Sequence, residues 1–398
     1  MILIISAAFP PEPVVAASMT FDLAEALAEK WNVVVITPEP TRPLGFSFKS
    51  EEPVSRKYEH IILKSFTYPK SRLPGRLLES YSFGKHAASF IKKERYRIQC
   101  CYVNAWPLVA QFMIIRILKS LCIPSVIHIQ DIYPECFTQK IPVIGNLITR
   151  ILLPLDRCTL KSSSKIITIS SGMKNHLVTT RKLDEINVEV VHNWQNEEMF
   201  IRSKNVSSQK STNSKFTFMF LGNLSGTAAI HVLMYAFNAS RLDKSRLIIA
   251  GNGSEKENLI SLADSLHESD IEFCDASRKE VPDIQCKADV LLLSLKMGTA
   301  KFALPSKLLA YMFSAKPIIA CVDEDSDIAQ AIKEGTCGWV IPPENAEALA
   351  NTMRSVILLP QPDLETYGEN GLKYAVENFS RIKSLMKLVA IINCLMKS

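Results

Sequence analysis

The feature that most constrains the fold of this chain is a regular alternation of short apolar runs with segments of helical periodicity. Residues 1–5 form an apolar run, residues 18–30 carry apolar side chains on one helical face, and residues 33–36 form the next apolar run. Short apolar runs indicate buried strands, and the order strand, helix, strand is typical of βαβ units. The alternation therefore predicts an α/β chain with parallel sheets.

This alternation occurs twice, with one polar interruption. In the first half we expect further strands at 98–103, 124–129, 165–169 and 189–191, and helices at 76–93, 110–121, 142–162 and 171–179. Residues 203–215 then contain almost no apolar side chains, as linkers do. After them we expect strands at 216–221, 245–250, 271–273, 290–293, 317–320 and 338–341, and helices at 227–239, 255–266, 306–314, 346–358, 367–378 and 380–397.

The pattern predicts two Rossmann-like domains. We assign the first domain to residues 1–202, a linker to 203–215, the second domain to 216–378, and a C-terminal helix that packs back on the first domain to 379–398. Two doubly wound domains that face one another place a deep cleft between the carboxyl ends of their sheets. We expect the chemistry to lie in that cleft.

Charge excludes one class of function. The 398 residues carry 46 Lys+Arg against 40 Asp+Glu, a net charge of +6, which is well short of the dense basic surface of a nucleic-acid binder. Residues 1–190 hold 24 basic and 16 acidic side chains, whereas residues 191–398 hold 22 and 24. The basic excess thus belongs entirely to the first half.

Cysteine and histidine usage indicates the compartment. The 10 cysteines and 7 histidines are scattered, with no Cys-x-x-Cys, so we predict buried reduced thiols and no metal site. Reduced thiols are typical of the cytosol. The apolar N-terminus lacks a basic flank and runs into Pro10-Pro11, unlike a signal peptide, and no apolar run is long enough to span a membrane. We expect a cytoplasmic protein.

The segment from Lys301 to Pro317 is the most informative for chemistry. A predicted strand ends before it, Ser306 is placed to cap the following helix, and Lys301 and Lys307 lie close by. Free amides in a first helical turn, together with cationic side chains, form a site for a phosphate or diphosphate. The alternative is an ordinary helix cap with solvated lysines.

Six short motifs follow one another along the chain in an order that is informative as a set. The motifs are Phe9-Pro10-Pro11-Glu12-Pro13, Gln130-Asp131-Ile132-Tyr133-Pro134-Glu135, Val191-His192-Asn193-Trp194, Leu221-Gly222-Asn223-Leu224, Ala250-Gly251-Asn252-Gly253 and Leu304-Pro305-Ser306-Lys307. In these motifs and their order, the chain resembles the family 4 glycosyltransferases of the GT-B fold, and more narrowly the bacterial branch that adds fucosyl or N-acetylfucosaminyl residues in building colanic acid, capsule and O-antigen. The resemblance extends over residues 1–378.

The resemblance implies a retaining, metal-independent transfer of a sugar from a UDP- or GDP-linked donor to a hydroxyl acceptor, with no cofactor. The acceptor would be a polyprenyl-diphosphate-linked sugar or an oligosaccharide, bound by the first domain. The second domain would hold the donor, and Lys307 would stabilise the leaving phosphate. By the same resemblance, the donor-binding residues are Gly222, Asn223, Lys301, Leu304, Pro305, Ser306 and Lys307, with Ala276 and Ser277 near the nucleobase.

In the first domain the resemblance points to the end of the strand at 124–129. It implies that His128 hydrogen-bonds the donor sugar near the reacting centre and that Asp131 and Glu135 bind acceptor hydroxyls, with Asp131 close to the chemistry. The small residues Ala16, Ala17 and Ser18 would line the acceptor side. The alternatives are a structural histidine, and a capping or salt-bridge role for the two carboxylates.

Three departures from the family pattern keep other hypotheses open. Val14 to Ser18 replaces a glycine-rich loop, no cation follows Gly222-Asn223, and the usual Glu-x7-Glu pair would fall at Phe302 and Ala310. One alternative is therefore a GT-B protein that binds nucleotide without turnover. Another is an epimerase of nucleotide sugars, which would need carboxylates as acid and base and is disfavoured by the missing pair. A nicotinamide dehydrogenase is disfavoured because no Gly-x-Gly-x-x-Gly follows the first strand.

The segment from residue 70 to residue 97 is basic and amphipathic. Such helices lie on anionic membrane surfaces, and residues 140–153 would add an apolar edge. The alternative is a helix that packs its apolar face on its own sheet with the charges solvated. If the membrane interpretation holds, the protein is peripheral on the inner face of the cytoplasmic membrane. The basic residues are Lys70, Arg72, Arg76, Lys85, Lys92, Lys93, Arg95 and Arg97, against Glu79 and Glu94.

Overall fold

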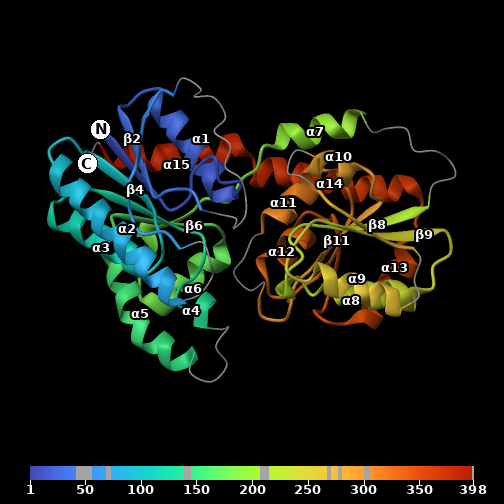
Figure 1. Cartoon of the computed structure of the whole chain (residues 1–398). Coiled ribbons are helices and arrows are strands. Elements are labelled where there is room, and N and C mark those ends of the chain that lie inside the picture. Colours follow the sequence, from blue (N-terminus) through green and yellow to red (C-terminus); the bar gives the residue numbers. More distant parts are fainter. Residues whose placement is uncertain are drawn as a thin grey trace. The chain divides into compact units, whose positions relative to one another are not determined.

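The computed structural model divides the chain into two compact units, which we describe separately (Figure 1). It describes residues 1–41, 56–68, 73–138, 145–206, 215–266, 270–276, 280–299 and 305–396. The first unit is Met1–His192 with Ile382–Ser398, and the second is Asn193–Arg381. The division thus falls ahead of the polar stretch that we expected to be the linker, because α7 (Glu197–Val206), a helix not predicted, is grouped with the second unit.

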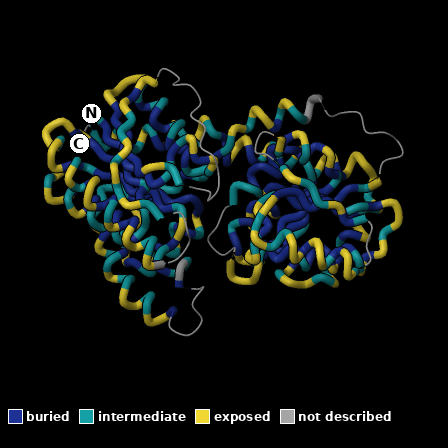
Figure 2. Tube along the Cα trace, in the orientation of Figure 1, coloured by how far each residue is buried: buried dark blue, intermediate teal, exposed yellow. Residues whose placement is uncertain are grey.

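The first unit contains a seven-stranded parallel sheet in the order β3-β2-β1-β4-β5-β6-β7. The strands are short and, apart from β3 at the edge, largely buried, which is why the sequence shows them as near-continuous apolar runs (Figure 2). Edge strand β3 has no such run and was not predicted. The bounds are β1 Ile2–Ser6, β2 Val33–Thr37, β3 Glu59–Ile62, β4 Cys100–Asn104, β5 Ser125–Ile129, β6 Lys165–Thr168 and β7 Val188–Val190.

Helices alternate with most of these strands along the chain. The C-terminal helix α15 lies in this unit, where Trp31 Nε1 donates a hydrogen bond to Asn393 Oδ1 at 3.0 Å. The short helix α4 was not predicted. The bounds are α1 Val15–Ala28, α2 Leu73–Glu94, α3 Val109–Ser120, α4 Glu135–Thr138, α5 Gly145–Ser162, α6 Ser171–Arg181 and α15 Arg381–Leu395.

The second unit repeats this architecture with six parallel strands in the order β10-β9-β8-β11-β12-β13. Alternate residues of a strand face opposite layers, so Met219 and Leu221 pack in one apolar cluster while Phe218 and Phe220 pack in the other. The strand bounds are β8 Phe216–Leu221, β9 Ser245–Ala250, β10 Ile271–Cys274, β11 Val290–Ser294, β12 Ile318–Cys321 and β13 Gly338–Ile341.

The helices of the second unit include three that the sequence did not suggest, α7, α10 and α12. Helix α10 spans 6 residues, too short to show a clear period. Helix α12 does bury an apolar face, made of Ile328, Ala329, Ala331 and Ile332, which we did not recognise in the sequence. The helix bounds are α8 Ile230–Ser240, α9 Lys256–Ser265, α10 Val281–Cys286, α11 Ser306–Phe313, α12 Asp327–Glu334, α13 Ala346–Val356 and α14 Gln361–Asn378.

The strand orders locate the binding edge of each sheet. The predicted α/β class with two Rossmann-like sheets is confirmed. In the first unit the order reverses between β1 and β4, and in the second between β8 and β11. Doubly wound folds bind ligands at the carboxyl ends of the strands that flank such a switch point.

The cysteines and helices bear on two further expectations. All 10 cysteines are free thiols, and Cys100, Cys101, Cys286, Cys321 and Cys337 are buried. Cys122, Cys158 and Cys394 are exposed, however, so burial was not predicted correctly for every thiol. Within the described ranges, no helix is long and apolar enough to cross a membrane.

Candidate active site

Lys307 and Gly222 meet at the switch point of the second unit. Gly222 directly follows β8, and Lys307 lies in the first turn of α11, the helix that follows β11. A Cβ atom added to Gly222 would lie 2.5 Å from Cε and 3.0 Å from Nζ of Lys307, so the lysine side chain lies directly over the glycine backbone. The fold thus brings together two of the residues that the resemblance assigns to the donor diphosphate.

The ammonium group of Lys307 is poorly hydrated and lacks an acidic partner in the described part of the chain. Its Nζ atom lies 3.7 Å from the ring centroid of Phe220. Burial lowers the pKa of Lys307 to about 7, because no carboxylate offsets the loss of water around the charged form. An incoming anion would supply the missing counter-charge.

Two glycine-containing loops, after β8 and after β9, lie close together beside Lys307. The amide of Gly222 donates to the Ala250 carbonyl at 2.9 Å. A Cβ on Gly251 would lie 2.1 Å from the carbonyl oxygen of Gly222, so only glycine permits the two loops to approach this closely. Gly222 and Gly251 both have positive φ, +150° and +130°. Asn223, the third predicted donor residue here, is exposed on the same loop.

Helix α11 begins differently from our expectation. Its cap residue is Pro305, and no side chain caps the helix, so the prediction that Ser306 is the capping residue is wrong: Ser306 is the first helical residue. The carbonyl of Ser306 instead accepts a hydrogen bond from Gln195 Nε2 at 2.5 Å. The first amides of α11 are therefore free of a side-chain cap.

Tyr311 fixes α11 against the sheet. One turn after Lys307, its buried hydroxyl accepts from the amide of Leu221 at 2.8 Å and lies 3.1 Å from the carbonyl oxygens of Leu221 and Leu292. These contacts tie the helix to both strands that flank the switch point, β8 and β11. The position of Lys307 over Gly222 follows from this attachment.

The remaining donor residues are placed only in part. Ala276 follows β10 and packs against the apolar cluster that includes Met219. Ser277, Lys301 and Leu304 lie outside the described residues, as do Phe302 and Ala303.

In the first unit, a cavity of about 130 Å³ opens at the other switch point, where β1, β4 and β5 end. It brings together Ala16, His128 and Asp131, three residues that the sequence nominated. It also contains residues 104–107, which we did not predict as site residues, although they directly follow the strand expected at 98–103. The lining is Ala7, Ala8, Ala16, Asn104, Ala105, Trp106, Pro107, Gln111, His128, Ile129, Gln130 and Asp131.

His128 lines this cavity and has one ring nitrogen without a hydrogen-bond partner among the described residues. Its Nδ1 atom lies 2.6 Å from the hydroxyl of Tyr102, while Nε2 is buried and has no hydrogen-bond partner among the described residues. Burial lowers the pKa of His128 to about 4, so the ring is neutral at physiological pH. A neutral buried imidazole with one free nitrogen is suited to a hydrogen bond with a bound ligand.

Two of the small residues expected on the acceptor side do not reach the cavity. Ala17 is fully buried in α1, and the hydroxyl of Ser18 donates to the Val15 carbonyl at 3.1 Å. Only Ala16 of the three lines the cavity. Asp131, by contrast, is exposed and lies on the cavity wall.

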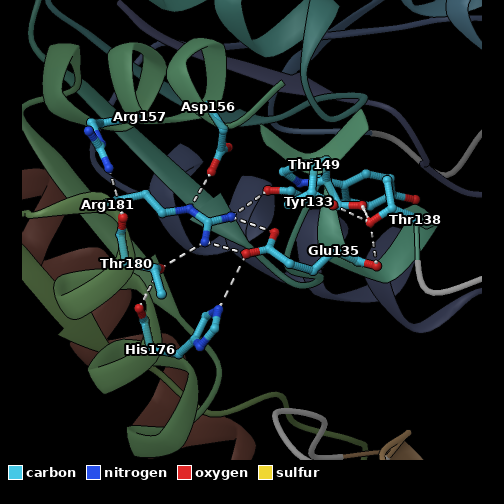
Figure 3. A network of polar contacts seen from close by, with 10 residues as sticks. Tyr133, Glu135, Thr138, Thr149, Asp156, Arg157, His176, Thr180 and Arg181 are labelled. Carbon is cyan, nitrogen blue, oxygen red and sulfur yellow. Dashed lines mark hydrogen bonds and ion pairs between the residues drawn. The ribbon is translucent and has the colours of Figure 1, made fainter. Parts of the chain in front are cut away.

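Glu135 is engaged in a buried ion pair (Figure 3). Arg181 contacts both of its carboxylate oxygens, at 2.5 and 2.6 Å, and His176 Nε2 lies 3.4 Å away. Burial raises the pKa of Glu135, but the hydrogen bonds from His176 and Arg181 outweigh it and hold the value at about 2. The sequence left two roles open for Glu135, binding of acceptor hydroxyls or a salt bridge. The structure shows the salt bridge, with Arg181, and this geometry does not support acceptor binding.

Arg181 connects the loop that follows β5 to two helices. The side chain is fully buried and donates from Nε to Asp156 Oδ2 on α5 at 2.8 Å and from Nη2 to the Tyr133 carbonyl at 2.8 Å (Figure 3). Burial, together with the negative charge of Glu135, raises the pKa of Asp156 to about 6, and the charge and hydrogen bond of Arg181 offset this only in part. The loop that carries Asp131 to the cavity is therefore anchored from its far end.

The basic helix α2 combines charged and apolar exposed residues. Leu77, Leu78 and Tyr81 are exposed near its beginning, whereas Lys92 and Lys93 are exposed in its last turns. Arg76 and Arg97 form ion pairs with Glu79 and Glu94 at 3.2 and 2.9 Å. Lys70 and Arg72 lie outside the described residues, as do residues 139–144.

Comparisons with known proteins agree with this geometry. Residues 16–198 match the domain family described as Glycosyltransferase Family 4, and residues 215–358 match the family described as Glycosyl transferases group 1. The chain is 24% identical over 287 residues to the probable glycosyltransferase WbjE of Pseudomonas aeruginosa, covering 68% of each chain.

Solved structures share the fold at low sequence identity. HepE from Anabaena, in complex with UDP and glucose, is 14% identical with a TM-score of 0.70, covering 98% of this chain and 99% of that one. Sucrose-phosphate synthase from Thermosynechococcus elongatus is 14% identical with a TM-score of 0.75, covering 100% and 99%. The matched domains and the fold together show that the chain is a glycosyltransferase of the GT-B type.

Proposed function

We propose that the chain transfers a sugar from a nucleoside diphosphate sugar to a hydroxyl acceptor, with retention of configuration and without a metal ion. The observation that carries the proposal is the position of Lys307 over Gly222 at the switch point of the second unit. A diphosphate there would restore a counter-charge to a dehydrated ammonium group, and the same contact would stabilise the phosphate that leaves when the glycosidic bond breaks. HepE, which has this fold, binds UDP-glucose.

The donor is best described as a UDP- or GDP-linked sugar, and we propose a deoxyhexose such as fucose or N-acetylfucosamine. This narrower proposal follows from the motif order, which resembles that of the fucosyl and N-acetylfucosaminyl transferases. For the acceptor we propose a polyprenyl-diphosphate-linked sugar or an oligosaccharide used in bacterial surface polysaccharide. The cavity at His128 and Asp131 supports a sugar-binding role for the first unit, because it offers a buried hydrogen-bonding nitrogen beside an exposed carboxylate.

Isothermal titration with UDP, GDP and their sugars tests the proposal. We expect one of these nucleotides to bind and Lys307→Ala to weaken it by at least about tenfold, since a charge-assisted hydrogen bond contributes about 1.5–3 kcal/mol. Lys373→Ala is the matched control, because Lys373 is an exposed lysine of the same unit. Absence of binding by every nucleotide at millimolar concentration would refute the transferase proposal.

We also propose a peripheral contact of α2 with anionic membrane, because exposed Leu77, Leu78 and Tyr81 lie on the same helix as exposed Lys92 and Lys93. Flotation with liposomes that contain anionic lipid measures it. Neutralising Lys92 and Lys93 is expected to reduce the bound fraction, as each basic residue near such a surface contributes about 1 kcal/mol. The same change at Lys287 and Lys373, exposed in the second unit, serves as control. Equal recovery of both proteins contradicts the proposal.

A further inference from the structure

We propose that Tyr102 is a positioning residue that holds His128 in the tautomer protonated at Nε2, so that His128 offers the bound sugar a hydrogen-bond donor and not a base. The nature of the ligand rests on the proposed transferase function. The tautomer rests on the geometry of the first unit alone. The two parts of the proposal can therefore be tested separately.

The sheet register places the two side chains together. Tyr102 on β4 pairs with Val126 on β5, and His128 is two residues further along β5, on the same face of the sheet. The Tyr102 hydroxyl lies 2.6 Å from Nδ1 of His128, and the two rings meet edge to face with centroids 6.0 Å apart. Both side chains are buried, so water does not compete for this hydrogen bond.

The direction of this hydrogen bond follows from the available partners. Among the described residues, Nδ1 of His128 is the only hydrogen-bond partner of the Tyr102 hydroxyl. Burial raises the pKa of Tyr102, so the hydroxyl stays protonated. If Nδ1 were the donor, this buried O–H group would have no acceptor among the described residues, so we assign the hydroxyl as the donor and Nδ1 as the acceptor. An Nδ1 that accepts carries no proton, and in a neutral imidazole the single ring proton then lies on Nε2.

The protonated nitrogen is the one that is left for a ligand. Nε2 has no acceptor in the described part of the chain, and His128 lines the cavity at the ends of β1, β4 and β5. A buried N–H group without an acceptor is costly, so an oxygen of a bound ligand is favoured there. Because this nitrogen has no free electron pair, His128 is unable to remove a proton from a sugar hydroxyl in this state.

Nuclear magnetic resonance of the full-length protein, labelled with nitrogen-15 in histidine, tests the tautomer directly. The chain has 7 histidines, and the signals missing from a His128→Gln protein identify those of His128. We expect Nδ1 at the shift of an unprotonated nitrogen and Nε2 at the shift of a protonated one. A wild-type spectrum with the proton on Nδ1 overturns the proposal, whatever the variants do.

Tyr102→Phe tests whether Tyr102 is responsible. We expect the two ring nitrogens of His128 to move toward the averaged shifts of a mixture of tautomers. Tyr58→Phe is the matched control, because it removes another buried tyrosine hydroxyl of the same unit that has no hydrogen-bond partner in the described residues. Unchanged His128 signals in Tyr102→Phe would overturn the positioning role.

Transfer kinetics connect the tautomer to function. We expect Tyr102→Phe to lower turnover by roughly 10- to 100-fold, by analogy with partners that orient a metal-ligating histidine. UDP or GDP affinity should change by less than about twofold, since the nucleotide site proposed above lies in the second unit. Equal turnover of Tyr102→Phe and Tyr58→Phe contradicts the link. A protein that binds no nucleotide but shows the expected tautomer refutes the proposed function and leaves the tautomer assignment intact.

Discussion

The side chain of Lys307 lies over the backbone of Gly222, so close that a single added methyl group on the glycine would meet Cε of the lysine at 2.5 Å. Gly222 directly follows strand β8, and Lys307 lies in the first turn of the helix that follows the neighbouring strand β11. Parallel pairing of β8 and β11 brings both to the same edge.

Gly222→Ala is expected to displace Lys307 and to weaken nucleotide binding by about tenfold, which is the loss of one charge-assisted hydrogen bond. It also places alanine at φ +150°, a strained backbone that costs on the order of 1–3 kcal/mol. Gly298→Ala separates the two effects, because Gly298 also has positive φ but a Cβ there meets nothing within 4 Å. Titration with UDP and thermal unfolding of both proteins measure them. Similar nucleotide affinities for the two variants would contradict the proposed contact.

Donor binding should weaken as the pH rises. The pKa of Lys307 is about 7 in the free protein, so the charged form is lost as the pH rises through that value. A diphosphate favours the charged form and raises this pKa, so binding above pH 7 takes up a proton. Titration with UDP-glucose at about pH 8.5, in two buffers of different ionisation enthalpy, measures the uptake. Lys307→Met should bind weakly, with no such uptake.

Arg181→Met is expected to destabilise the first unit by about 3–5 kcal/mol, because it leaves the partly buried Glu135 and the buried Asp156 without their cation. Chemical denaturation followed by circular dichroism measures the loss. Arg202→Ala is the control: its ion pair with Glu198 is exposed, and its removal should cost less than about 1 kcal/mol. Comparable losses in the two proteins would mean that the network in Figure 3 does not stabilise the fold.

Asp156 and Glu135 should act on stability in opposite directions as the pH falls. Asp156 has a folded pKa of about 6 against an ordinary 3.8, so its protonation stabilises the fold as the pH falls from about 6 to 4. Glu135 has a folded pKa of about 2 against 4.5, so its contribution is lost as the pH falls from about 4.5 to 2. Thermal midpoints against pH should show that Asp156→Asn removes the first effect and Glu135→Gln the second. Unchanged profiles would contradict these pKa values.

The sequence predicted the elements that are apolar and repetitive. Residues 1–5 and 216–221 alternate with amphipathic helices, and buried parallel strands need no more than such runs to be recognised. Sequence reasoning missed α10, which is short, and edge strand β3, which has no apolar run. It also missed α7 and α12, although α12 buries an apolar face and begins at a Ser326 cap. It also placed the domain boundary after Arg202, because the polarity of residues 203–215 is visible in the sequence whereas the packing of α7 is not.

For the site, the sequence nominated residue types and the tertiary structure decided their roles. Lys307 and Glu135 are both charged residues next to short motifs, and nothing local distinguishes them. Folding leaves Lys307 without an acidic partner in the described residues, whereas it surrounds Glu135 with Arg181 and His176. A charge whose partner is supplied by the fold stabilises the fold, and one whose partner is missing is available to a ligand. That difference depends on contacts between distant segments, which the order of residues alone does not contain.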